Sequence, residues 1–346
     1  MAQVGRLFIP SSSWLRPILL FLISDPMASL KNRGATQAVT PYSDTVAGYL
    51  LVWLAAALWA GLGPIYKLLM GFGIPPLTVV TFRAALAALI LAGWTLARQR
   101  SLGGLRIARE DWPLMLSYGA IGIACFYAAY IYAVQLTGVA VAVVLMYTAP
   151  AWVALIAWWR LGEGMDGPRA LALLCALAGC VLVAQAYDPT ALRLNAMGVL
   201  CGLGSGLGYG LYSVFNKLAL RRYVPTTVQF YGFAIGTGFL ALSQSPASLL
   251  MPLRSPWLLG GLVLMAIGPT LGGGLAYAAG VRRLPVSVAS LVATLEPALA
   301  TLFGYLLFGE VLRPGQWIGA CLILAAAILL RPSTPTGTAV RGRTVR

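Results

Sequence analysis

Histidine is absent from the 346 residues of this chain. Imidazole is the usual general base near neutral pH and a common zinc ligand, so histidine-based catalysis and the usual imidazole metal sites are excluded. The five cysteines, Cys125, Cys175, Cys180, Cys201 and Cys321, all lie in apolar runs and form no CxxC pair. We interpret them as small apolar fillers and predict no disulfide framework, no metal site and no cofactor.

Charged residues are scarce as well. They make up 10% of the chain, whereas a soluble globular protein carries about 25%. Hydrophobic residues reach 60%, and the mean hydropathy is +0.84. This composition predicts a membrane protein.

Ten apolar runs are long enough to cross a membrane, since about 20 apolar residues span roughly 30 Å of hydrocarbon. The sequence therefore predicts an all-α membrane protein with ten transmembrane helices. The expected crossings lie at about 48–70, 77–97, 112–136, 138–159, 168–187, 196–219, 226–244, 257–281, 286–308 and 314–331.

The formal charge of +15 results mainly from arginine, and arginines mark the cytoplasmic side of a membrane protein. With a cytoplasmic N-terminus, ten loop arginines fall inside and three outside. We therefore predict a multi-pass protein of the cell inner membrane, embedded in the lipid bilayer with both termini in the cytoplasm. The basic charge is spread over many loops, so we predict no nucleic-acid partner. The inner arginines are Arg98, Arg100, Arg106, Arg109, Arg160, Arg169, Arg221, Arg222, Arg282 and Arg283, and the outer ones are Arg193, Arg254 and Arg313.

The two ends of the chain lie outside the predicted crossings. Residues 1–45 are predicted to be an N-terminal extension. Their apolar run, 14–23, is too short to span a membrane, and no small-residue cleavage site follows it. We interpret Met27 as the true start, with an interfacial helix as the alternative. Residues 332–346 lack apolar periodicity, so we expect a disordered basic tail.

An internal repeat divides the chain into two halves, predicted at 48–187 and 196–331. Residues 139–163 align with 286–310 at an offset of 147. Eight of the 25 positions are identical: Val139/Val286, Val141/Val288, Ala142/Ala289, Pro150/Pro297, Ala151/Ala298, Leu155/Leu302, Gly162/Gly309 and Glu163/Glu310. With five crossings per half, the second copy must enter the membrane from the opposite side. Such inverted repeats are typical of secondary transporters, whose substrate site lies between the halves.

The fourth helix of each half carries a Pro and ends in Gly-Glu, as LGE at 161–163 and FGE at 308–310. Two five-helix halves with this signature resemble the drug/metabolite transporter superfamily, EamA type, over nearly all of 48–331. Among its known members, the chain is closest in character to the aromatic amino acid exporters. The resemblance implies a secondary transporter, not an enzyme, that exports small metabolites, above all amino acids including aromatic ones, by alternating access around a central cavity. Nucleosides, amines and thiol compounds remain alternative substrates.

Two other classes of membrane protein fit the sequence less well. An intramembrane enzyme needs catalytic groups, and Ser205 lies in GLGSGLG without a plausible base. A channel commonly builds its pore from charged rings or carbonyl filters in several subunits. We therefore favour transport of a small-molecule substrate, with no obligate protein partner evident.

Glu296 is the leading candidate for a functional residue. An ionisable group inside a crossing is costly, and Glu296 lies at the middle of the ninth one. It is a neutral, hydrogen-bonded structural acid, a partner for a substrate ammonium or buried cation, or a proton-coupling group. Its counterpart in the first half is Ala149, so the repeat symmetry is broken at this position.

Basic residues within crossings are candidates too. Lys67 and Lys217 occupy related positions in the two halves, and only three lysines occur in the chain. Each either extends to the membrane interface or meets a substrate carboxylate or Glu296. Arg83 lies near the outer surface, so we interpret it as extending to the interface.

Aromatic residues complete the predicted substrate site. Rings can stack on an aromatic substrate, and their hydroxyls can orient it. Lipid-facing and helix-packing roles remain open for these positions. The full set of predicted substrate-binding residues is Trp59, Tyr66, Lys67, Tyr130, Tyr147, Tyr212, Asn216, Lys217 and Glu296.

Glycine and proline mark possible moving parts. Glycines at 198, 202, 206 and 210 form one stripe on the sixth crossing, which allows close helix packing and could also serve as a sliding surface. Pro64 and Pro269 lie within crossings and remove backbone hydrogen bonds. We predict Pro64, Gly202, Gly206 and Pro269 as gating or hinge positions, with plain packing as the alternative.

Glu163 and Glu310 end the fourth helix of each half, just before Pro168 and Pro314 open the next one. A carboxylate there can accept backbone N–H bonds at a helix start. We interpret both as structural connectors.

The topology can be tested with reporter fusions placed in the loops between crossings. We expect ten passes, with the loops at 98–111 and 220–225 cytoplasmic and the loop at 245–256 outside. Nine or eleven passes, or two halves inserted in the same orientation, would contradict the inverted repeat.

Overall fold

The structure is a computed structural model that describes residues 42–188, 195–309 and 311–330. The predictions for Met27, for residues 1–41 and for 332–346, and the positions Arg193 and Glu310, lie outside these residues. Every regular element in the described ranges is helical. The α-helices are α3 (Tyr42–Ala60), α4 (Leu62–Leu69), α5 (Pro76–Gln99), α6 (Trp112–Ser117), α7 (Phe126–Thr137), α8 (Val139–Met146), α9 (Ala149–Ile156), α10 (Gly167–Val183), α11 (Ala196–Ala219), α12 (Pro225–Leu242), α13 (Pro246–Leu250), α14 (Pro256–Met265), α15 (Gly273–Arg283), α16 (Val286–Ala293), α17 (Leu295–Phe308) and α18 (Pro314–Leu329).

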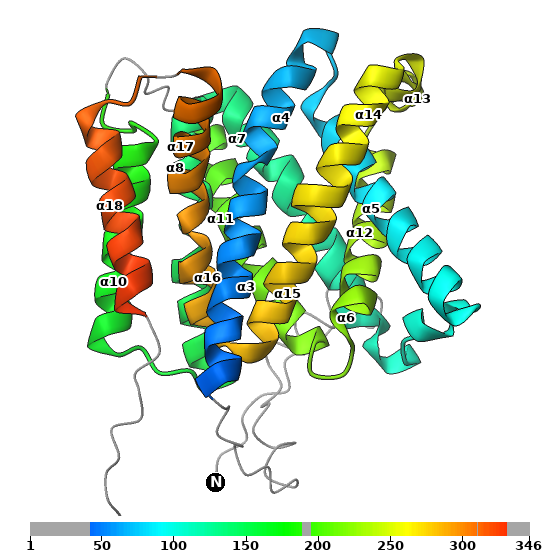
Figure 1. The fold of residues 1–346 in the computed structure, drawn as a ribbon, viewed down its shortest axis with the longest axis horizontal. Coiled ribbons are helices and arrows are strands. Elements are labelled where there is room, and N and C mark those ends of the chain that lie inside the picture. Colours follow the sequence, from blue (N-terminus) through cyan, green and yellow to red (C-terminus); the bar gives the residue numbers. More distant parts are fainter. Residues whose placement is uncertain (1–41, 189–194, 310, 331–346) are drawn as a thin grey trace, which may run out of the picture.

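Most of these helices run side by side along one direction (Figure 1). Several combine into longer segments, in part through the π-helical stretches Tyr118–Cys125, Ala157–Leu161 and Ala266–Gly272. Two shorter apolar helices, α10 and α18, and the 18-residue α12 complete the bundle. The predicted all-α membrane fold is confirmed, whereas ten crossings in inverted repeats remain a prediction. The segments long and apolar enough to cross a membrane are Ser43–Leu69, Pro76–Gln99, Arg109–Thr137, Val139–Leu161, Ala196–Ala219, Pro256–Arg283 and Val286–Phe308.

Both repeated segments are interrupted near their middle. One turn separates α8 from α9, and another, at Thr294, separates α16 from α17. Pro150 and Pro297 lie in the first turns of α9 and α17. Proline is tolerated there because the first N–H groups of a helix have no partner within it. The interruption places Glu296 in the first turn of α17, at the positive end of that helix dipole.

The glycine stripe on α11 brings that helix against α7 and α8. A Cβ on Gly198 would lie 2.5 Å from Thr137 Cγ2, and one on Gly206 would lie 2.6 Å from the carbonyl oxygen of Leu145. Real Cβ atoms essentially never approach so closely, so larger residues at these positions would force the helices apart. Close packing, one of the two predicted roles of the stripe, is therefore seen; its use as a sliding surface remains a prediction.

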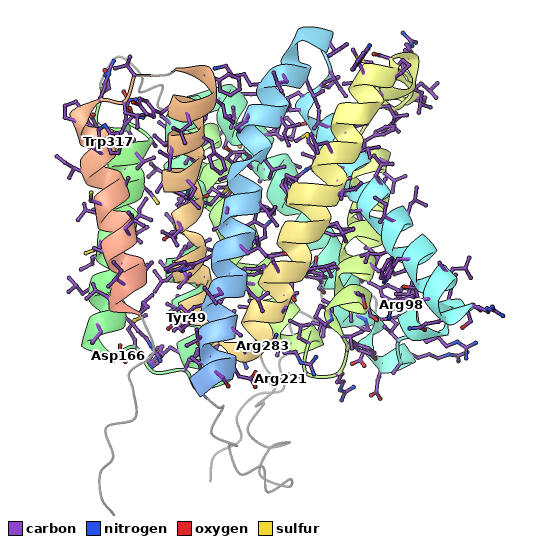
Figure 2. All side chains as sticks on the ribbon, in the orientation of Figure 1. Tyr49, Arg98, Asp166, Arg221, Arg283 and Trp317 are labelled. Atoms are coloured by element: carbon purple, nitrogen blue, oxygen red, sulfur yellow. The ribbon has the colours of Figure 1, made fainter. Side chains whose placement is uncertain are left out.

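Charged groups fix the helix ends at one side of the bundle. Arg221, Arg283 and Asp166 lie toward one end, and Trp317 lies toward the other (Figure 2). Lys217, near the end of α11, donates hydrogen bonds of 2.6 Å to the carbonyl oxygens of Val281 and Leu284. The side with Arg221 and Arg283 is the one that the arginine distribution predicts to be cytoplasmic.

Glu163 joins the two halves at this same end. Its carboxylate accepts hydrogen bonds from Val286 N at 2.9 Å, from Ser287 N at 3.1 Å and from Ser287 Oγ at 2.5 Å. It therefore caps α16, a helix of the other half. The connector role was predicted, but its helix was wrong: α10, the next helix in sequence, is capped by Asp166, which accepts from Arg169 N.

Replacing Glu163 with alanine should destabilise the protein by about 1–3 kcal/mol, because α16 loses a charged cap. Glu163→Gln should have a smaller effect, since the amide oxygen still accepts a hydrogen bond. The apparent melting temperature of the detergent-purified chain measures both effects. The matched control is Glu110→Gln, at an exposed carboxylate paired with Arg222. A Glu163→Ala variant that melts like wild type would contradict the cap.

Candidate functional site

A cavity of about 720 Å³ lies inside the helix bundle. Small-molecule sites in proteins usually measure about 300–1,000 Å³. Most of its lining comes from α3, α4, α5, α7, α8, α11 and α17, with single residues from α10, α12, α14, α15 and two π-helical stretches, so that both predicted halves contribute. Most of the lining is aliphatic or aromatic. The charged side chains among the lining residues are Arg83 and Glu296.

Aromatic rings from α3, α7 and α11 line this cavity and contact one another. Trp59 of α3 lies edge-on to Tyr209 of α11, with 6.3 Å between ring centroids. Tyr209 stacks on Phe126 at 5.2 Å, and Tyr212 stacks on Tyr118 at 5.4 Å. Stacking at these distances holds the rings in fixed orientations. The cavity therefore offers flat, rigid surfaces to a ligand.

A buried polar network holds the hydroxyl groups of Tyr118, Tyr212 and Tyr277. The Tyr209 hydroxyl is buried without a hydrogen-bond partner among the described residues. Gln229 accepts a hydrogen bond from Tyr118 OH at 3.3 Å and donates one to Tyr212 OH at 3.5 Å. The same amide donates to the carbonyl oxygen of Gly274 at 3.1 Å. Tyr277, which stacks on Tyr212, is bonded to Ser213 Oγ at 2.8 Å. Because these groups satisfy one another, the network can persist away from water.

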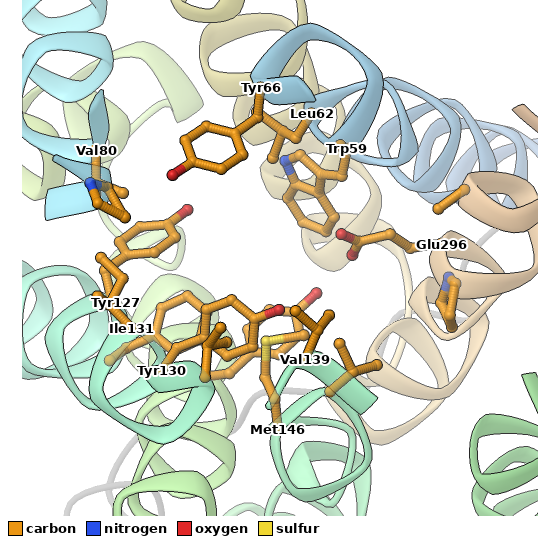
Figure 3. A pocket seen from close by; sticks show the side chains of 18 of the residues that line it. Trp59, Leu62, Tyr66, Val80, Tyr127, Tyr130, Ile131, Val139, Met146 and Glu296 are labelled. Carbon is orange, nitrogen blue, oxygen red and sulfur yellow. The ribbon is translucent and has the colours of Figure 1, made fainter. Parts of the chain in front are cut away.

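Glu296 extends into the cavity from the first turn of α17, facing the region lined by Trp59 and Met146 (Figure 3). Tyr147 and Arg83 line the same cavity. The carboxyl group is therefore placed where a ligand would contact it.

Arg83 is a cavity residue that the sequence reasoning missed. Only 4% of its surface is exposed, and it lines the cavity, so the interpretation that it extends to the interface is wrong. Its Nη1 donates to Thr270 Oγ1 at 3.2 Å, and its guanidinium lies 4.5 Å from the ring centroid of Tyr127. Its position two turns inside α5, which begins at Pro76, was the signal that could have identified it.

Six of the nine predicted substrate-binding residues line the cavity. They come from both halves of the chain and converge on the same space, around which Figure 3 labels Trp59, Tyr66, Tyr130 and Glu296. Their role in binding remains a prediction. The six are Trp59, Tyr66, Tyr130, Tyr147, Tyr212 and Glu296.

The other three predicted residues, Lys67, Asn216 and Lys217, do not line the cavity. Lys67 is exposed and lies over the ring of Phe308, 4.2 Å from its centroid. Lys217 is held by the carbonyl oxygens at the end of α15. Asn216 is fully buried, and its side chain makes no hydrogen bond to any described residue. In this conformation none of the three is placed to contact a ligand in the cavity.

None of the four predicted gating positions belongs to the cavity lining. Pro269 is buried within the π-helical stretch Ala266–Gly272, beside Thr270, which anchors Arg83. Pro64 lies in α4 beside Gly63, a lining residue. A Cβ on Gly202 or Gly206 would collide with Leu145, just before the α8–α9 interruption. Their gating role remains a prediction.

Comparisons with known proteins agree with the prediction that the chain is a transporter. The model of the EamA-like transporter family matches this chain twice, at residues 46–185 and 196–331. The uncharacterized transporter YwfM of Bacillus subtilis is 28% identical over 289 residues, which cover 81% of this chain and 92% of that protein. A probable terminal-alkyne amino-acid exporter of Streptantibioticus cattleyicolor is 26% identical over 288 residues, covering 82% of this chain and 94% of the exporter.

The fold also has a solved counterpart. One crystal structure superposes on the chain with a TM-score of 0.68 and covers 82% of it and 96% of its own chain. Its sequence identity is 20%, so the likeness concerns the fold alone.

The cavity can be tested by thiol labelling in a variant whose five native cysteines are replaced. Thr301 lines the cavity, whereas Ala298, on the same helix, is 8% exposed and does not line it. We expect a water-soluble thiol reagent to modify T301C readily and to leave A298C unmodified. Equal labelling of both variants, or of neither, would contradict a water-accessible cavity beside α17.

Proposed function

The chain belongs to the EamA-like transporter family, and from that premise we propose that it is a secondary transporter that exports amino acids, including aromatic ones. Export proceeds by alternating access around the central cavity, in the cell inner membrane, with both chain termini in the cytoplasm. The family consists of transporters, and in our proposal the cavity binds and releases its substrate without chemical change.

The observation that carries this proposal is an aromatic cavity with Glu296 at its edge. An α-ammonium group can pair with a carboxylate through charge-assisted hydrogen bonds. The rings of Trp59, Tyr209 and Tyr212 offer stacking surfaces for an aromatic or aliphatic side chain. Of the three roles predicted for Glu296, we therefore favour the partner of a substrate ammonium.

The helix directions support two inverted halves. The start of α3 lies beside the α15–α16 connection, because a Cβ on Gly48 would lie 2.8 Å from Leu284 Cγ. The end of α11 lies beside the same connection, through Lys217. The first helices of the two halves therefore begin at opposite ends. We propose ten crossings: the seven long segments, α10, α12 and α18.

The conformation fits an outward-facing state. The cavity lining extends to Gly63, Gln135 and Val139, which are exposed at the end opposite Arg221 and Arg283. At the predicted cytoplasmic end, Glu163 ties the first half to the start of α16. Opening the cavity to the cytoplasm would require this contact to break. We propose Pro64, Pro269, Gly202 and Gly206 as the positions around which the helices move.

The substrate class has support from one relative, whose name records probable export of a terminal-alkyne amino acid. Amines are the strongest competing class, because an ammonium group alone would also satisfy Glu296. A nucleobase would also stack on these rings, but nucleosides and thiol compounds as classes lack the ammonium group that Glu296 pairs with in our proposal.

Transport into proteoliposomes tests the proposal. We expect the purified chain to accumulate or exchange radiolabelled phenylalanine, tyrosine or leucine above the level of empty liposomes. Glu296→Gln should lower kcat/KM about tenfold or more, because a hydrogen bond to a charged group contributes about 1.5–3 kcal/mol. Glu110→Gln serves as the exposed control.

Two results would contradict this function. The first is transport of nucleosides or amines without any amino acid in the panel. The second is full activity of Glu296→Gln, which would leave Glu296 a structural acid. Direction is measured separately, as faster efflux of preloaded amino acid from cells that express the chain.

A further inference from the structure

We propose that Arg83 binds the substrate carboxylate and that Arg83 and Glu296 together select molecules carrying both a carboxylate and an ammonium group. This inference rests on the proposed function, because it deepens the account of the same cavity. The proposed function names Glu296 as the partner of the ammonium group and the rings as stacking surfaces. This inference adds a role for Arg83 in substrate specificity.

The depth of Arg83 is the first argument. It lies two turns inside α5 with 4% of its surface exposed, and it lines the cavity. A buried charge without compensation costs several kcal/mol. The helix nevertheless places its guanidinium at the cavity, where a ligand anion would provide that compensation.

The contacts of Arg83 orient the guanidinium but leave most of its donors unused by the protein. One nitrogen donates to Thr270 Oγ1, and the group lies over the Tyr127 ring. A guanidinium has five N–H donors in a rigid fork that matches a carboxylate. The Thr270 bond is the sole hydrogen bond that this fork makes to the described residues. The remaining N–H donors of the guanidinium therefore suit an anion with two oxygen atoms, such as a carboxylate.

Glu296 provides the second charge at a suitable place. It lines the same cavity as Arg83, yet the two side chains form no direct ion pair in the described structure. An α-amino acid carries its ammonium and carboxylate on one carbon atom. In our proposal it pairs with Glu296 and Arg83 at once while its side chain faces the rings.

Selectivity follows from the charge that the wrong ligand leaves unpaired. When the cavity closes during the transport cycle, an amine without a carboxylate would leave the charge of Arg83 uncompensated. A carboxylic acid without an ammonium group would leave the charge of Glu296 uncompensated. An unpaired buried group discriminates more strongly than a missing apolar contact. The two charges therefore exclude amines, the competing class that Glu296 alone would accept.

The two residues also come from different halves, Arg83 from α5 and Glu296 from α17. A bound zwitterion would bridge the halves that move relative to each other. Substrate binding would then couple directly to their rearrangement.

The test compares three ligands of similar shape: phenylalanine, phenethylamine and 3-phenylpropionate. Transport and equilibrium binding are measured with the full chain in proteoliposomes, for wild type, Arg83→Gln, Arg83→Lys and Arg254→Gln. Arg254 is an exposed arginine in the connection before α14. It is the matched control for loss of one positive charge.

We expect wild type to prefer phenylalanine over both single-charge analogues by at least about tenfold, which corresponds to about 1.4 kcal/mol. Arg83→Gln should lose most of its phenylalanine binding and bring the phenylalanine-to-phenethylamine ratio close to one. Arg83→Lys keeps the charge without the fork and should lower this ratio less. Arg254→Gln should keep the wild-type ratio.

The outcomes separate this inference from the proposed function. If wild type transports no amino acid, the proposed function fails and this inference with it. If wild type transports phenylalanine but Arg83→Gln keeps the wild-type ratio, the function stands and the role of Arg83 is overturned. Should Arg83→Gln fail to fold, Arg83→Lys decides, and an unchanged ratio in that variant overturns the inference.

Discussion

The cost of burying charge in a membrane shapes the centre of this protein. Arg83 is buried, Glu296 is partly buried, and both line the same cavity. A charge in such a place needs hydrogen-bond partners or a counter-charge. The Tyr127 ring supplies a cation–π contact to Arg83, and Thr270 accepts one hydrogen bond from it. In our proposal the substrate supplies the remaining compensation.

The sequence repeat differs between its two copies at the position that lines the cavity. Pro150 and Pro297 open equivalent half-helices in the two copies, but the residue before each proline is Ala149 in one and Glu296 in the other. The interruption exposes the start of α17 to the cavity, and one substitution between the copies provides the acid. Glu163, whose counterpart in the second copy is Glu310, lies at the predicted cytoplasmic end. There it caps α16, a helix of the opposite half.

The sequence was informative where a single residue type had a strong physical consequence. The apolar composition predicted the membrane fold, the glycine stripe predicted close packing of α11, and the depth of Glu296 identified a cavity residue. The sequence was less informative where the rotation of a helix about its axis decides which side chains face the cavity. Tyr66 and Lys67 are neighbours in the sequence, yet Tyr66 lines the cavity and Lys67 does not. Arg83 was missed because its exposure depends on how neighbouring helices cover α5. The partner of Glu163 is set by a contact between residues more than 120 positions apart.

A structure of the full chain with bound L-phenylalanine tests the central claim most directly. The account predicts density in the cavity between α5 and α17, with the carboxylate at the Arg83 guanidinium, the ammonium at Glu296 and the ring against Trp59 and Tyr209. A ligand bound elsewhere, or one whose carboxylate lies away from Arg83 while the amino acid is still transported, would contradict it.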